Sequence, residues 1–281
     1  MGSDQRTMPI KTILAHLAND DRHAARLTVA AAMARRFDAF VEALYIATPA
    51  SMPAAVTGRA ASYGYIAEAT AVAREQAAVI EQEARLALKD LSFSWTVAEG
   101  DHVDLLAARA TYADLAVVTQ SHPAHLEDRL PLHLPERLPL FTPCPTLVLP
   151  YDHPADRPVA GRHILVAWRN SRESGIAVRN ARHFLAEAEK VTVLTVDAAD
   201  SRDDSGQDLI VFLERHGVPA SHRAEADRGD VGQIILNTAE ELGCDMVVMG
   251  AYGHSRLREL VFGGATRTVM RNMRTPVLMS H

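Results

Sequence analysis

Glycines near the C-terminus occur at spacings that suit the binding of an anion. Gly250, Gly253 and Gly263 form the pattern G-x2-G-x9-G directly after Asp245 and the apolar run 246–249. A backbone without Cβ can approach a ligand closely and can adopt positive φ, so its N–H groups can point at a phosphate. The pattern therefore predicts a strand, a phosphate-binding loop and the start of a helix.

A degenerate copy of this block lies earlier in the chain. Residues 114–119 precede residues 245–250 by 131 positions, and residues 145–149 precede residues 276–280 by the same offset. Two upstream matches have other offsets. Gly100-Asp101 matches Gly229-Asp230 at an offset of 129, and residues 13–15 match residues 164–166 at an offset of 151. The first copy thus carries about twenty extra residues between its first and third strands, and the period is too long for a solenoid.

The repeat and the length predict two domains. A chain of 281 residues exceeds the usual domain size of about 100–200 residues. Residues 1–150 form the degenerate copy, and residues 159–281 form the copy with the glycine motif. The stretch 150–158 contains three prolines and several polar residues, which is typical of a linker.

Strand and helix patterns alternate along both copies. In the second copy we predict strands at 162–168, 191–196, 221–226, from 245 and at 276–279, and helices at 174–188, 208–216, 231–242 and 266–273. In the first copy we predict strands at 12–15, 40–46, 93–97 and 115–119, and helices at 21–36, 66–91 and 103–112. Continuous apolar strands separated by helices indicate a doubly wound α/β fold with a five-stranded parallel sheet in each domain. The extra segment 48–65 is expected to be a loop or short helix over the carboxyl edge of the sheet, where such folds bind ligands.

The glycine pattern, its flanking strand and helix, and the tandem copies resemble the universal stress protein family. The resemblance implies a Rossmann-like, adenine nucleotide alpha hydrolase-like fold and a role in the stress response. It also implies that the second domain binds an adenine nucleotide, namely ATP, ADP or AMP, with or without Mg²⁺. Because the last strand pairs subunits in this family, Leu147 and Leu149 are expected to pair antiparallel with Leu278 in an intramolecular pseudo-dimer, and a further homodimer is an alternative.

Two positions depart from the family pattern. The hydroxyl residue expected after the third glycine is Gly264, although Thr266 follows two residues later. The acidic residue expected after the first strand, which contacts adenine in the family, is Arg169, whose planar group of donors suits a phosphate or carboxylate. The residues assigned to the nucleotide site are Ala167, Trp168, Arg169, Val196, Gly250, Gly253, His254, Gly263, Gly264, Ala265 and Thr266.

The first copy lacks the glycine motif. Its aligned positions are Thr119, His122, Leu132 and His133, so we do not expect nucleotide binding there in the manner of the family. Imidazole and carboxylate groups follow in the loop, at His122, His125, Glu127, Asp128 and His133. Zinc at this loop is an alternative, but we assign no metal site because zinc needs three or four convergent ligands.

Composition narrows the class of protein. A formal net charge of −6 and a pI near 6.1 argue against a nucleic-acid partner. The sequence shows neither a secretory leader nor an apolar run long enough for a membrane helix, so we expect a cytoplasmic protein. Cys144 and Cys244 lie near strand starts, in no metal-ligand spacing, and are expected to be reduced thiols.

Three functions remain open at this point. The first is a stress-response binding protein that holds an adenine nucleotide in its second domain. The second is slow ATP hydrolysis, although no Walker lysine or dedicated Mg²⁺ ligand is visible and no catalytic residue is assigned. The third is a ligand-free protein-interaction module, in which the glycines serve only the turn from strand to helix.

Overall fold

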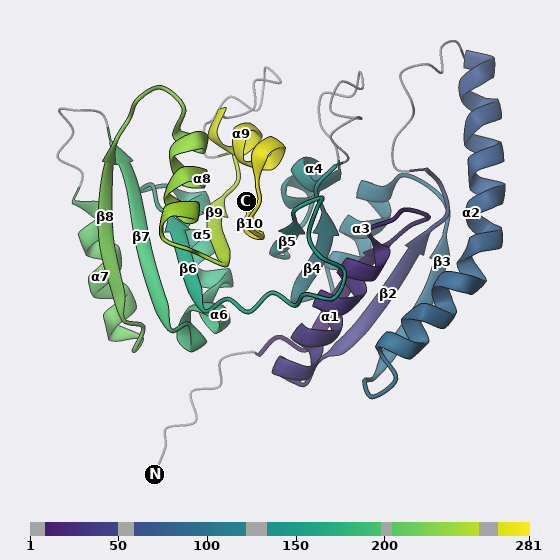
Figure 1. The fold of residues 1–281 in the computed structure, drawn as a ribbon, viewed down its shortest axis with the longest axis horizontal. Helices are drawn as coiled ribbons and strands as arrows, with labels where there is room; N and C mark the ends of the chain where they lie inside the picture. Colours follow the sequence, from purple (N-terminus) through teal and green to yellow (C-terminus); the bar gives the residue numbers. More distant parts are fainter. Residues whose placement is uncertain (1–8, 50–58, 122–133, 198–203, 253–263) are drawn as a thin grey trace.

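The computed structural model describes residues 9–49, 59–121, 134–197, 204–252 and 264–281. Within these residues the strands form a single ten-stranded sheet in the order β3-β2-β1-β4-β5-β10-β9-β6-β7-β8. Figure 1 shows the two halves of this sheet side by side, with β5 and β10 at the centre. We call β1–β5 and their helices the N-terminal half, and β6–β10 and theirs the C-terminal half.

The strands of each half are parallel to one another. They are β1 (Thr12–Leu17), β2 (Phe40–Ile46), β3 (Phe93–Ala98), β4 (Leu115–Thr119) and β5 (Thr146–Leu149), then β6 (His163–Ala167), β7 (Lys190–Asp197), β8 (Ala220–Ala226), β9 (Met246–Gly250) and β10 (Val277–Ser280). The central strands β1, β4, β5, β9 and β10 are almost entirely buried. Their continuous apolar sequences follow from burial on both faces.

Helices cover both faces of the sheet. One face packs against α1 (His23–Phe37), α2 (Arg59–Ala87), α5 (Arg172–Asn180), α6 (Arg182–Glu187) and α7 (Ser205–Arg215). The other face packs against α3 (His102–Ala110), α4 (Leu134–Phe141), α8 (Val231–Glu241) and α9 (Gly264–Asn272). Each face has one cluster of buried apolar side chains that draws on both halves, so the core is continuous across the repeat. No helix in the described part of the chain is long and apolar enough to cross a membrane.

The two halves join through β5 and β10. These strands pair antiparallel, and Leu147 lies opposite Leu278 as the sequence predicted. Leu149 was also expected to take part in this pairing, but the described register ends with Val148 opposite Val277. The predicted fold class is confirmed, and the antiparallel contact makes two five-stranded sheets into one.

The register also fixes which residues of the two halves are equivalent. Ile13 lies beside Leu115 in the N-terminal half, and Ile164 lies beside Met246 in the C-terminal half. The equivalent residues of the two pairs differ by the repeat offsets, which are 151 for Ile13 and Ile164 and 131 for Leu115 and Met246. Equivalent positions along β1 and β6, and along β4 and β9, can therefore be compared directly.

Some predicted elements were wrong in detail. The helix expected over 174–188 is two helices, α5 and α6, which meet at Ala181. The segment 48–65 was expected to be a loop or short helix, but its residues from Arg59 onward belong to the 29-residue helix α2. Residues 50–58 of that segment lie outside the described residues, and α4 was not predicted.

Candidate functional site

A cavity of about 680 Å³ lies at the carboxyl ends of the central strands in the C-terminal half. We call it the C-terminal cavity. It opens between β6 and β9, where chain order reverses in the sheet, since β7 and β8 follow on one side of β6 while β9 and β10 lie on the other. Doubly wound sheets bind ligands at this switch point because the loops diverge there.

Most residues assigned to the nucleotide site line this cavity. They are Ala167, Trp168, Arg169, Val196, Gly250, Gly264, Ala265 and Thr266. The other three, Gly253, His254 and Gly263, lie outside the described residues. The fold thus brings together residues from β6, β7, β9 and α9 that are up to about one hundred positions apart in the sequence.

Three helix N-termini meet at the C-terminal cavity. Ser171 caps α5 by accepting a hydrogen bond from the backbone nitrogen of Ser174 at 3.3 Å. Asp230 caps α8 and accepts from the backbone nitrogen of Gln233 at 3.1 Å. Gly264 begins α9. Helix N-termini carry unpaired N–H groups and partial positive charge, which favour an anion.

Other lining residues were missed by the sequence analysis. Leu194, Ile235 and Met249 give the cavity an apolar wall, while Asp197 and Asp227 place carboxylates at its rim. Asp197 is the last residue of β7 and Asp227 directly follows β8, and the backbone nitrogen of Asp227 donates to the carbonyl of Asp197 at 2.9 Å. The signal that could have found them is a polar residue directly after each predicted strand.

Gly250 has a structural reason to be glycine. A Cβ atom at this position would lie 2.6 Å from the backbone nitrogen of Ser174 and 2.7 Å from the carbonyl carbon of Glu173. The absence of a side chain therefore lets the first turn of α5 pack against the end of β9. By contrast, a Cβ atom at Gly264 would meet no atom within 4 Å, so that position is open toward solvent and the cavity.

Tyr252 forms the turn that follows β9. Its φ is 57°, a left-handed value that is uncommon outside glycine. Its backbone nitrogen donates to Oγ1 of Thr266 at 3.5 Å, which ties the turn to the first part of α9. Burial, with a smaller contribution from Glu136 of the N-terminal half, raises the pKa of the Tyr252 hydroxyl.

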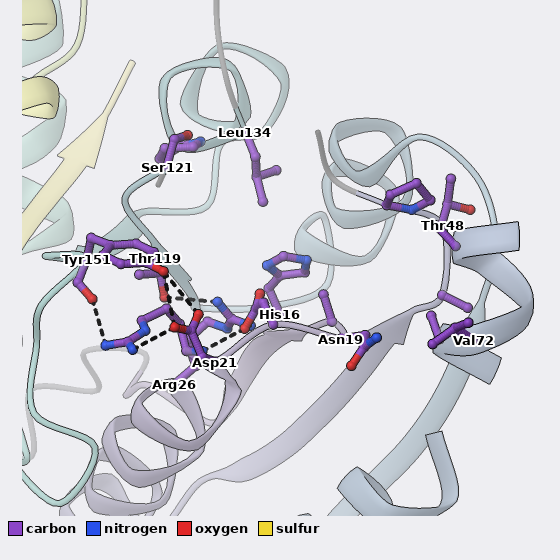
Figure 2. A pocket seen from close by; sticks show the side chains of 18 of the residues that line it. His16, Asn19, Asp21, Arg26, Thr48, Val72, Thr119, Ser121, Leu134 and Tyr151 are labelled. Carbon is purple, nitrogen blue, oxygen red and sulfur yellow. Dashed lines mark hydrogen bonds and ion pairs between the residues drawn. The ribbon is translucent and has the colours of Figure 1, made fainter. Parts of the chain in front are cut away.

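A second cavity, of about 610 Å³, occupies the corresponding place in the N-terminal half. We call it the N-terminal cavity. Figure 2 shows its side chains at the ends of β1 and β4, with Leu134 and Ser121 at one end and Val72 of α2 at the other. This cavity was not predicted from the sequence, because the N-terminal copy lacks the glycines that predicted the other one.

The floor of the N-terminal cavity contains a buried ion pair. The Arg26 side chain is only 3% exposed, and one of its terminal nitrogens donates to both carboxylate oxygens of Asp20 at 2.7 Å. The other terminal nitrogen donates to Oγ1 of Thr119 at 3.0 Å. The Asp20 carboxylate also accepts from the backbone nitrogen of Arg22 at 2.9 Å, at the N-terminus of α1.

The contact between α1 and β4 in the N-terminal half differs from the equivalent contact between α5 and β9 in the C-terminal half. Position 119 of the N-terminal half corresponds to Gly250, and positions 20 and 26 correspond to Ser171 and Ala177 by the offset of 151. The glycine and the small side chain let α5 approach β9 directly. In the N-terminal half Thr119 occupies that space, and the Arg26 side chain with Asp20 fills the gap between helix and strand.

Metal ligands do not cluster in either cavity. Among the described residues there is no group of three or more His, Cys, Asp or Glu side chains that could hold a metal ion. The loop that carries His122, His125, Glu127, Asp128 and His133 lies outside those residues. Cys144 and Cys244 are free and buried, as expected, and burial raises the pKa of the Cys144 thiol to about 12.

Comparisons with known proteins agree with this architecture. Residues 161–281 match the model of the universal stress protein family. A stretch of 50 residues is 42% identical to the universal stress protein Slr1230 of Synechocystis sp., and covers 18% of this chain and 17% of that protein. The chain therefore matches about a sixth of the length of this curated relative.

Two solved structures match nearly the whole chain. A universal stress protein from Archaeoglobus fulgidus has a TM-score of 0.72 at 14% identity, over 96% of this chain and 95% of its own. A protein of unknown function from Pseudomonas aeruginosa PAO1 has a TM-score of 0.63 at 19% identity, over 96% and 92% of the two chains. At these identities the likeness is one of fold. Residues 161–281 therefore match the universal stress protein family, and the whole chain shares its fold with these two solved structures.

Proposed function

We propose that this chain is a stress-response binding protein whose C-terminal cavity holds an adenine nucleotide. The observation that carries the proposal is the start of α9 at Gly264, where open space faces the cavity. Backbone N–H groups of a helix start can bind phosphate without any side chain. The hydroxyl that the family pattern has at this position is therefore not required for contact with the anion.

The remaining walls fit the other parts of a nucleotide. The apolar side chains of Leu194, Val196 and Met249 suit the face of a purine ring. The carboxylates of Asp197 and Asp227 suit the hydroxyl groups of a ribose, which need acceptors. Arg169, at the end of β6, supplies donors for a phosphate or for acceptor atoms of the base. Mg²⁺ would accompany the phosphates as their counter-ion.

Titration calorimetry with ATP, ADP and AMP, with and without Mg²⁺, tests the proposal. We expect one nucleotide per chain. Gly264→Asp should weaken binding at least tenfold, which is about 1.4 kcal/mol, because it adds negative charge at the phosphate position. Gly175→Asp is the matched control, since Gly175 lies in α5 outside this cavity and a Cβ there also meets no atom within 4 Å.

The alternative is a ligand-free interaction module, and one observation favours it. Gly250 is explained by the packing of α5 alone, so the glycine motif does not by itself require a ligand. Native mass spectrometry of protein purified without added nucleotide separates the two functions. A bound nucleotide supports the first, whereas an empty protein that also gives no calorimetric signal at millimolar nucleotide supports the second.

A further inference from the structure

A chain of two buried histidines reaches the N-terminal cavity, which is lined by His16 but not by His102. Nε2 of His16 lies 2.9 Å from Nδ1 of His102, and Nε2 of His102 lies 2.6 Å from the carbonyl oxygen of Thr48. The His16 side chain is 3% exposed and His102 is 5% exposed. In the C-terminal half the corresponding positions are Ala167 and Val231 by the repeat offsets, so this pair belongs to the N-terminal half alone.

The hydrogen bonds determine where the protons lie. Because a carbonyl oxygen only accepts, Nε2 of His102 must carry hydrogen and donate to Thr48. Burial lowers the pKa of both imidazoles, with Arg26 adding to the effect on His16, so both rings are neutral. Nδ1 of His102 is then an acceptor, and Nε2 of His16 donates to it. It follows that Nδ1 of His16 carries no hydrogen and is an acceptor.

Among the described residues nothing donates to this acceptor, Nδ1 of His16, and the Nε atoms of Arg22 and Arg26 are donors without an acceptor. All three residues line the cavity, and Figure 2 shows the imidazole of His16 between the Arg26–Thr119 group and Thr48. Buried polar atoms without partners are rare in native proteins and often mark a site for a water molecule or a ligand.

The charges of the N-terminal cavity disfavour a phosphate. Asp20 already occupies the N-terminus of α1, where an anion would otherwise bind, and it is paired with Arg26. The Asp21 carboxylate accepts from Arg22 at 3.0 Å and from the hydroxyl of Tyr151 at 3.1 Å. Glu68 adds a third carboxylate to the lining. Both arginines are therefore already paired with carboxylates, whereas in the C-terminal cavity the open start of α9 has no acidic residue in its first turn.

The opposite wall is apolar and open. Ala69, Val72 and Ala73 of α2 line the cavity together with Tyr65. Val72 is 46% exposed although it lies inside this concave surface, so a ligand could bury it. We propose that the N-terminal cavity binds an uncharged molecule of nucleoside size, with N–H or O–H donors, an acceptor and a flat apolar face. This site is independent of the nucleotide site proposed for the C-terminal cavity.

Adenosine is the probe, with AMP as its matched comparison because AMP adds only the phosphate. The protein carries Gly264→Asp, which weakens phosphate binding in the other cavity. Calorimetry should show one adenosine bound per chain, and AMP should bind at least tenfold more weakly. Absence of adenosine binding at millimolar concentration, or equal affinity for AMP, would overturn the proposal.

Two substitutions on α2 locate the site. Val72→Trp should fill the cavity and abolish adenosine binding. Val79→Trp is the control, because Val79 is 50% exposed one heptad further along the same helix and does not line the cavity. If Val72→Trp does not fold, Val72→Glu takes its place, since a charged residue suits an exposed helix position. Adenosine binding that survives at position 72, or is lost equally at position 79, contradicts the assignment.

Discussion

The side chain of Gln120 donates a hydrogen bond from Nε2 to the carbonyl oxygen of Met270 at 2.8 Å, across the boundary between the two halves. The same nitrogen donates to the carbonyl of Arg271 at 3.0 Å, and the side-chain oxygen accepts from the backbone nitrogen of Tyr151 at 2.9 Å. Gln120 lines the N-terminal cavity, whereas the first turn of α9 lines the C-terminal cavity. This nine-residue helix therefore begins at one candidate site and ends against a residue that lines the other.

We expect Gln120→Ala to destabilise the fold by about 1–3 kcal/mol, because it leaves the buried carbonyl of Met270 without a donor. Urea denaturation measures the change. Asn272→Ala is the control at the same helix end: its side chain donates to Thr268 at an exposed site, and its loss should change stability by less than about 0.5 kcal/mol. Equal losses of stability from the two substitutions would show that the hydrogen bond between the halves stabilises the fold no more than an exposed one does.

Gly250→Ala should destabilise the protein by about 1–3 kcal/mol, since the new methyl group would overlap the backbone of α5. Gly264→Ala, which adds the same methyl group in open space, should stay within about 0.5 kcal/mol of the parent. The midpoints of urea denaturation compare the two. A tolerated alanine at 250 would mean that α5 moves away from β9 at little cost.

Removal of Asp20 should be more costly than an ordinary surface change. Asp20→Ala leaves the buried Arg26 cation without its partner, and we expect a loss of about 3 kcal/mol, the lower end for buried pairs, because the Asp20 side chain is 33% exposed. The double variant Asp20→Ser with Arg26→Ala copies Ser171 and Ala177 of the other half. In denaturation experiments the double variant should lose less stability than the sum of its single substitutions.

Acid should destabilise the N-terminal half through its two histidines. Burial lowers the pKa of His16 and His102 below 6.5 in the folded state. Above pH 6.5 these rings are neutral in both states and contribute nothing. Below it the unfolded chain takes up protons that the folded chain does not, so the free energy of unfolding falls as pH drops from 7 to 5, by up to about 1.4 kcal/mol per pH unit for each proton.

The variant His16→Ala with His102→Val, which copies Ala167 and Val231, isolates this effect. Its free energy of unfolding should depend less on pH between 7 and 5, whatever its absolute stability. His163, whose pKa is also lowered by burial, remains in both proteins and contributes to the residual slope. An unchanged slope would mean that folding does not shift the pKa of the two imidazoles.

Much of the fold could be predicted from the sequence because its strands are buried on both faces. A run such as 115–119 is continuously apolar, and its predicted bounds are those of β4. Helix α4 was missed because Pro135 and Pro139 argue against a helix in sequence, although Pro135 lies in its first turn and Pro139 is buried within it. No glycine or proline marks the break at Ala181, so tertiary packing alone divides α5 from α6.

The candidate sites were predictable only in part. The glycine motif led to the C-terminal cavity because it is a local pattern. The N-terminal cavity depends on residues distant in sequence, since His16 and His102 are 86 positions apart and meet only when β1 and α3 pack together. Asp197 and Asp227 were missed for the same reason, because they lie at the ends of different strands.

The antiparallel contact of β5 with β10 also has a consequence for synthesis. About 130 residues separate the two strands, and chains fold from the N-terminus as they emerge from the ribosome. Until β10 is made, β5 is an unpaired edge whose four residues are all apolar or β-branched, and such edges pair readily with other chains. A pause of the ribosome within the C-terminal half would therefore prolong the exposure of this edge and favour exchange of the strand with a neighbouring chain.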